Sequence, residues 1–317
     1  MSDDQTGPDP HHPVTAPHPA GSPSSSPQRP DSGPTTPPLA APPPPGAQPG
    51  GFQPGAHQPG EFPPVAQQPV APPHSPVPAR EVRAGLSLVG VFLAGQMTML
   101  LVSVLVLLAY GSADVGLLED GRLLALLVVP TSLAAVVAVV GTAWFGGGPR
   151  LGRAARELAV RWNVKEIAIG LALGLGGLAL TLPAAAVWAA WVGEDQASSA
   201  VGDAFAGRQL APAAAVVVFL AVWLIAPLAE EVLFRGVLWR AFEHLGWNRW
   251  VVFAATSLVF SIAHLELLRT PLLLVLSIPI GLARLFTGNL LASVVAHQVN
   301  NFLPAVALLL ATTGALP

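Results

Sequence analysis

Apolar runs long enough to cross a lipid bilayer begin directly after Arg83, and they restrict the fold of this chain more than any other feature. A membrane-spanning helix needs about 20 mostly apolar residues. We count about seven such runs, at roughly 85–110, 122–145, 166–192, 212–240, 250–267, 271–286 and 289–312. We therefore predict an all-α fold, a polytopic transmembrane helical bundle of about seven spans.

The residues before these runs have a different composition. Of the 34 prolines, 25 precede Arg80 and nine follow it. The first segment is rich in Pro, Gly, Ser and Gln and has no apolar periodicity, so it cannot bury enough apolar surface to offset chain entropy. We predict a disordered Pro/Gly/Gln-rich tail over 1–80 and a transmembrane domain over 82–312.

Charges outside the runs alternate along the chain, which predicts an orientation. Cations gather before the first run and at every second connection: Arg80, Arg83, Arg150, Arg153, Arg156, Arg161, Lys165, Arg240, Arg249 and Arg284. The other connections are poor in cations. The positive-inside rule then predicts a multi-pass protein of the cell membrane with a cytoplasmic tail. His244 and Glu266 lie near predicted boundaries and are interpreted as solvated residues without a role.

Composition excludes several classes of protein. The net charge of −3 and the lack of basic stretches interleaved with aromatic residues argue against a nucleic-acid partner. The chain has no cysteine, which excludes disulfides and thiolate metal sites. We expect the lipid bilayer as the surroundings of most of the chain, since 52% of its residues are hydrophobic and 10% are charged.

The fourth run contains two adjacent glutamates, in the segment Ala229-Glu-Glu-Val-Leu-Phe-Arg235, although no charge lies between Pro212 and Leu228. A charge at the centre of a membrane helix costs roughly 2.5–3.5 kcal/mol, so these carboxylates need partners. Glu231 and Arg235 are four residues apart and share a helix face, which predicts an ion pair. Glu230 points to another face and has no local counter-charge, which suits a general base.

Three polar residues of later runs are predicted at a similar depth. Counted at about 1.5 Å per residue from the nearest boundary arginine, Glu230, His264 and His297 lie roughly 15, 22 and 20 Å into the bilayer. His297 and Asn301 are four residues apart and can present an imidazole and an amide to one point. Taken singly, each residue has a structural alternative, such as a hydrogen bond between helices. Their common depth favours one shared site.

Together these residues resemble the three motifs of the CAAX-protease and bacteriocin-processing family, also called CPBP or Abi, which is related to the type II CAAX prenyl endopeptidase. The motifs read Glu230-Glu231-Val-Leu-Phe-Arg235, Phe260-Ser-Ile-Ala-His264 and His297-Gln-Val-Asn-Asn301. The resemblance covers roughly 205–312, which is the predicted catalytic core.

The resemblance implies an intramembrane endopeptidase acting on a membrane-associated or lipidated protein or peptide. Its catalytic residues would be Glu230, Glu231, Arg235, His264, His297 and Asn301. Glu230 and His264 would activate a water molecule, and His297 with Asn301 would stabilise the oxyanion. Glu231 and Arg235 would orient the site.

The metal requirement stays open at this stage. Glu230, His264 and His297 could bind zinc, and the family has been labelled a metalloendopeptidase. However, the chain lacks the His-Glu-x-x-His arrangement of zinc peptidases. We expect chemistry without a required cofactor, with zinc as the alternative.

Two other functions compete with the peptidase. A proton-coupled transporter could relay protons through the same glutamates and histidines, although the chain shows no internal repeat of the kind many transporters have. A catalytically silent membrane scaffold or immunity protein could keep the fold for binding alone. The three intact motifs favour the peptidase.

Overall fold

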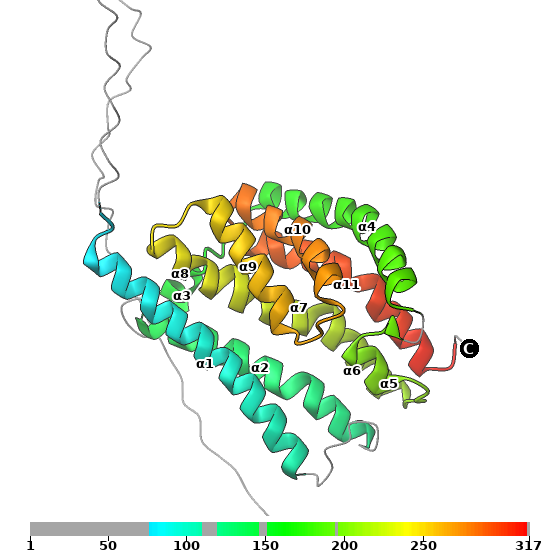
Figure 1. Ribbon diagram of the computed structural model, residues 1–317. Helices are drawn as coiled ribbons and strands as arrows, with labels where there is room; N and C mark the ends of the chain where they lie inside the picture. Colours follow the sequence, from blue (N-terminus) through cyan, green and yellow to red (C-terminus); the bar gives the residue numbers. More distant parts are fainter. Residues whose placement is uncertain (1–75, 110–118, 146–150, 194–195, 316–317) are drawn as a thin grey trace, which may run out of the picture. The chain divides into compact units, whose positions relative to one another are not determined.

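The computed structural model describes residues 76–109, 119–145, 151–193 and 196–315, and within these ranges the chain is helical and contains no strand. This confirms the predicted all-α membrane fold. Within the described ranges, six helices are long and apolar enough to cross a membrane. They are α1 (Ala79–Ala109), α2 (Asp120–Phe145), α4 (Val164–Val192), the continuous helix Pro212–His244, α10 (Thr270–Thr287) and α11 (Leu290–Thr312), most of them labelled in Figure 1. The predicted tail lies outside the described residues up to residue 75.

The predicted seventh span, 250–267, is a shorter helix than expected. α9 (Arg249–Ala263) has 15 residues, or roughly 22 Å at 1.5 Å per residue, less than the roughly 30 Å of a bilayer core. It ends because Leu265 adopts a left-handed conformation with φ 58°, which turns the chain after His264. The count of about seven spans was therefore too high by one. Two further helices, α3 (Leu151–Glu157) and α5 (Ala200–Phe205), are short.

The long helix Pro212–His244 contains two segments of wider winding. It consists of α6 (Pro212–Leu220), η3 (Ala221–Ile225), α7 (Ala226–Glu231), η4 (Val232–Leu238) and α8 (Trp239–His244). The segments η3 and η4 are π-helical, a wider winding that is rare and often found at functional sites. The charged motif lies between and within them. This winding makes backbone carbonyls available to partners from other helices.

Helix α11 lies at the centre of the domain and contacts α4, α10, α6 and α7. Small residues let α4 approach it closely: a Cβ at Gly170 would stand 2.2 Å from the backbone oxygen of Ala292, too close for a real side chain. Small residues at such contacts are typical of membrane helix pairs. In Figure 1, α4 covers α10 and α11, while α1 and α2 pack side by side elsewhere.

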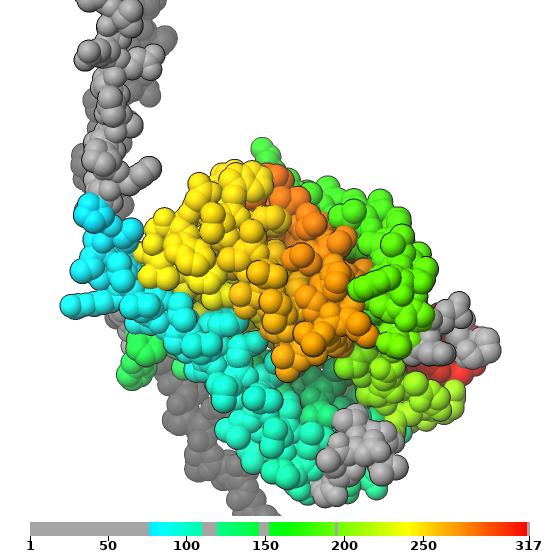
Figure 2. Space-filling view, in the orientation of Figure 1, coloured from blue at the N-terminus to red at the C-terminus, as the bar shows by residue number. Residues whose placement is uncertain are grey.

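The described surface is rich in apolar side chains, as expected for helices that face lipid. On α1, Leu93, Met97 and Leu101 are each more than half exposed. The space-filling view shows α1, α9 and α10 together on one face of the molecule (Figure 2). Such surface would be unfavourable in water and is stable against acyl chains.

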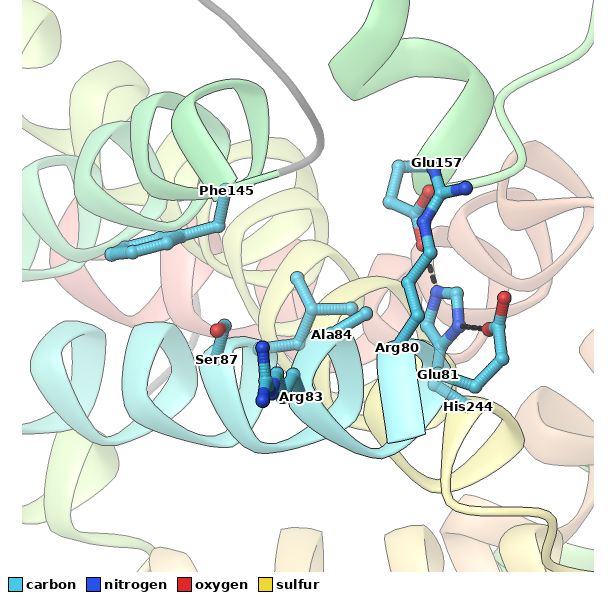
Figure 3. Close-up of a pocket in the computed structure, with 9 residues that line it drawn as sticks. Arg80, Glu81, Arg83, Ala84, Ser87, Phe145, Glu157 and His244 are labelled. Carbon is cyan, nitrogen blue, oxygen red and sulfur yellow. Dashed lines mark hydrogen bonds and ion pairs between the residues drawn. The ribbon is translucent and has the colours of Figure 1, made fainter. Parts of the chain in front are cut away.

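His244 was interpreted as a solvated residue without a role, and this is wrong. Its Nδ1 lies 2.5 Å from Glu81 Oε2 and its Nε2 lies 2.6 Å from Glu157 Oε1 (Figure 3). The imidazole therefore joins α8 to α1 and α3. The sequence offered no sign of this contact because the two glutamates are distant in the chain.

Candidate active site

Residues from each of the three motifs line one cavity of about 490 Å³. Glu230 enters it from α7, Phe260 and His264 from α9, and His297 and Asn301 from α11. The cavity thus collects the polar groups that the depth estimate placed in one layer. Their catalytic roles stay a prediction.

Behind the cavity wall lies a buried cluster of charged groups. Glu231 Oε1 accepts hydrogen bonds from Arg235 Nη1 at 3.0 Å and from His297 Nδ1 at 2.9 Å. The Glu231 and Arg235 side chains are 0% exposed, and the Arg235 guanidinium lies 4.6 Å from the centroid of the Phe260 ring. The predicted pair is present, and it holds the His297 ring in a defined orientation.

Glu230 has a different environment from its neighbour. Its side chain is 26% exposed, and its Oε2 lies 3.7 Å from His297 Nε2. Among the described residues it forms no ion pair with Arg or Lys. Glu230 is therefore the glutamate of the motif whose carboxylate faces the cavity.

The ring of His264 is oriented by its own helix. Its Nδ1 lies 2.8 Å from the carbonyl oxygen of Phe260. A carbonyl can only accept, so Nδ1 carries the hydrogen and Nε2 is the ring nitrogen left to accept a proton. His264 caps the end of α9, where the early termination of this helix exposes the ring to the cavity.

Asn301 contacts the first π-helical segment. Its Nδ2 donates to the carbonyl oxygen of Val222 in η3 at 3.2 Å. A side-chain amide has two hydrogens on this nitrogen, so one remains for another acceptor in the cavity. The neighbouring Asn300 has a structural place instead, since it accepts from Thr181 at 3.3 Å and joins α11 to α4.

Arg284 binds a backbone carbonyl of the second π-helical segment, as Asn301 does in the first. We expected it to be a boundary charge, but it is 2% exposed. Its Nε donates to the carbonyl oxygen of Arg235 in η4 at 3.0 Å, and its guanidinium lies 5.6 Å from the centroid of the Trp239 ring. The predicted boundary role is wrong because a partner 49 residues away in the chain binds the guanidinium. The sequence signal that could have predicted the burial of Arg284 is its place as a single cation in an apolar stretch.

In the cavity wall, Glu266 connects the turn after α9 to the first residue of α5. Its Oε1 accepts from the backbone amide of Ala200 at 2.8 Å, and its Oε2 accepts from Arg269 Nη1 at 2.9 Å. The interpretation of Glu266 as a solvated residue is therefore wrong. The spacing of three residues between Glu266 and Arg269 could have predicted the ion pair. The rest of the wall is mainly apolar: Leu127, Val201, Val222, Ala226, Leu273, Leu276, Pro304, Ala307, Leu308 and Ala311.

The candidate metal ligands do not form a metal centre in this geometry. The described residues contain no group of three or more His, Asp or Glu side chains arranged to hold a metal ion. Both ring nitrogens of His297 face carboxylates, and His264 Nδ1 is bonded to a carbonyl. We therefore derive no step through zinc.

Residues 212–303 match the family described as Type II CAAX prenyl endopeptidase Rce1-like. This segment of the chain is thus similar to the type II CAAX prenyl endopeptidases. The matched segment contains all three motifs and most of the cavity wall.

The chain is also similar to an uncharacterized 24.3 kDa protein of Escherichia coli. The two are 29% identical over 160 residues, which cover 49% of this chain and 66% of the relative. The chain thus spans slightly less than two thirds of that protein's length. No solved structure matches the chain.

Proposed function

We propose that this protein is an intramembrane endopeptidase that hydrolyses a peptide bond in a membrane-associated or lipidated protein or peptide. One observation carries the proposal: a single cavity within a helical membrane domain is lined by Glu230, His264, His297 and Asn301. It joins the Glu230 carboxylate, which has no Arg or Lys partner among the described residues, a proton-accepting imidazole nitrogen and an amide donor. This set suits acyl transfer to water.

In the proposed reaction, Glu230 and His264 Nε2 hold a water molecule beside the substrate carbonyl. Glu230 takes a proton from the water as its oxygen adds to the carbonyl carbon. The proton then passes to the amide nitrogen while the carbon–nitrogen bond breaks, giving a carboxylic acid and an amine. Glu230 is partly exposed in the cavity and pairs with no Arg or Lys among the described residues, which supports this assignment over Glu231.

The oxyanion of the tetrahedral intermediate would be stabilised from α11. Asn301 has one amide hydrogen left after its bond to Val222. His297 donates through Nδ1 to Glu231, so Nε2 is its donor when the ring is doubly protonated. Each donor aimed at an oxyanion contributes about 10²–10³ in rate. The Glu231–Arg235 pair would orient His297.

The walls of the cavity suggest the class of substrate. They are mainly apolar and lie in a domain surrounded by lipid, which favours a peptide that is itself lipidated or anchored in the membrane. With the tail in the cytoplasm, as the loop charges predict, Glu266 and its part of the cavity wall would lie toward the outer side.

Glu230→Gln tests the proposal directly. We expect cleavage of membrane peptides to fall by about 10²-fold or more, because the amide cannot take the proton, while the unfolding temperature stays unchanged. Membrane and released peptides from cells with either form would be compared by mass spectrometry. Glu119→Gln, at a carboxylate exposed outside the cavity, is the matched control.

Full cleavage by Glu230→Gln, His264→Ala and His297→Ala would overturn the peptidase. Proton-coupled solute flux that Glu230→Gln blocks, without any cleavage by the wild type, would favour the transporter. An unchanged phenotype in all three variants would favour the silent scaffold.

Metal removal separates the two proposed chemistries. We expect cleavage by the purified protein to continue after dialysis against 1,10-phenanthroline, because the cavity residues are bonded as a proton-transfer site rather than as a metal centre. Loss of cleavage that Zn²⁺ restores would instead establish a zinc enzyme.

A further inference from the structure

An apolar groove lies between α1 and α2, outside the residues that match the CAAX protease family. Its volume is about 780 Å³. It is lined by Ser87, Gly90, Val91, Ala94, Val136, Val137, Val140, Gly141, Trp144 and Phe145. A Cβ placed at Gly90 would meet nothing within 4 Å, so the groove is open at this point.

One end of the groove continues into a polar cavity of about 310 Å³, because Ser87 and Phe145 line both. This second cavity also contains Arg80 and Arg83. Figure 3 shows these arginines along α1, with Phe145 on the neighbouring helix and the His244 cluster beside them. The composite cavity therefore has an apolar body and a cationic end.

The charged side chains at the polar end differ in whether they already have a partner. The imidazole of His244 lies between the carboxylates of Glu81 and Glu157, at 2.5 and 2.6 Å. Arg80 and Arg83 are exposed, and in the described part of the chain no carboxylate lies within ion-pair distance of either. The two guanidinium groups are thus the groups free to bind an anion.

We propose that this composite cavity binds one anionic glycerophospholipid. Its phosphate would lie at Arg80 and Arg83, and one acyl chain would lie in the groove between α1 and α2. Basic pockets between membrane helices bind anionic head groups in this way, and guanidinium groups bind phosphate through paired hydrogen bonds. Trp144 and Phe145, exposed at the end of α2, are typical of the interfacial layer where the glycerol backbone lies.

A peptide fits the groove less well than an acyl chain. The polar side-chain groups of its lining are the Ser87 hydroxyl and the Trp144 indole N–H, so most backbone groups of an extended peptide would stay unpaired. A zwitterionic lipid would place a cationic group near both arginines, which disfavours it relative to an anionic lipid. The proposal does not depend on peptidase activity.

Fluorescence quenching tests the proposal on the full chain in nanodiscs. The probes are phosphatidylglycerol and phosphatidylcholine with brominated acyl chains, and the signal at the groove is the difference between wild type and Trp144→Phe. We expect half-maximal quenching at a roughly ten- to thirtyfold lower mole fraction of phosphatidylglycerol. The Arg80→Gln/Arg83→Gln variant should lose this preference, whereas Arg249→Gln, at an arginine outside both cavities, should keep it.

Gly90→Leu provides a second test, since the open space at this position accepts a side chain without strain. It should reduce quenching by both lipids while the unfolding temperature stays constant. Equal quenching by both lipids in wild type, or an unchanged preference in the double arginine variant, would overturn the proposal. Complete competition between soluble glycerophosphate and the brominated lipid would also overturn the proposal, because it would indicate a site for the anion alone. Absence of quenching would mean that protein, another segment or a second copy, occupies the groove.

Discussion

At the scale of single residues, the two adjacent glutamates have separate environments. Glu231 is fully buried and binds both Arg235 and His297, whereas Glu230 is 26% exposed and faces the cavity. The difference follows from helix geometry, since neighbouring residues point about 100° apart. Glu231 therefore supports the site, and Glu230 is available for proton transfer.

This separation predicts a coupled effect on stability. Glu231→Gln or Arg235→Met alone should lower the free energy of unfolding by about 3–5 kcal/mol, because each leaves a buried charge without its partner. The double variant should recover much of that loss but should not regain cleavage, since His297 loses its orienting carboxylate. Reversible denaturation in detergent measures the free energy of unfolding of the wild type, the two single variants and the double variant. Additive losses in the double variant would show that the pair is not coupled.

At the scale of elements, the two π-helical segments share one arrangement. Each has a carbonyl bound by a side chain from another helix: Asn301 binds Val222 in η3, and Arg284 binds Arg235 in η4. The motif between them is thereby held at both ends. Arg284 contacts the backbone of the residue whose side chain binds Glu231, so it acts on the site through Arg235.

Arg284→Lys should therefore lower kcat about ten- to hundredfold with little change in KM, because a small displacement of η4 misorients the groups behind the cavity. Lysine keeps the charge but lacks the planar group that donates through Nε. Steady-state cleavage of a fluorogenic membrane peptide gives both constants. Arg249→Lys is the control. A rise in KM at constant kcat would assign Arg284 to substrate binding instead.

At the scale of the whole molecule, the short α9 contributes to one part of the cavity wall. Because this helix ends at Ala263, the connection to α10 lies beside the segment that carries α5, and both line the cavity. Glu266 joins the two through the Ala200 amide. This part of the cavity wall is thus held by a contact between residues 66 apart in the chain.

Glu266→Gln should loosen this contact. A hydrogen bond to a charged group contributes about 1.5–3 kcal/mol, so we expect at least tenfold faster hydrogen exchange at the Ala200 amide. The substrate KM should change severalfold, with kcat nearly constant, because the motif residues are untouched. Exchange mass spectrometry and cleavage kinetics measure the two effects. Unchanged exchange at Ala200 would show that other contacts hold this segment.

The sequence alone was sufficient for the local features of this protein. Hydropathy and run length located every long helix to within several residues, and a four-residue spacing predicted the Glu231–Arg235 pair. Both succeed because a membrane helix is determined by its own residues, and a pair on one turn needs no tertiary contact. The three motifs could likewise be found in the sequence because each lies within a few consecutive residues of the chain.

Only the tertiary structure decided how the helices use their polar groups. The partners of Arg284, Glu266 and Asn301 are 49, 66 and 79 residues away in the chain. No local spacing encodes such contacts, and the π-helical turns that make two of the carbonyls available are not visible in hydropathy. The length of α9, and with it the count of six long helices rather than seven, depends on the turn at Leu265. The sequence determined which groups enter the membrane, and packing determined which of them meet.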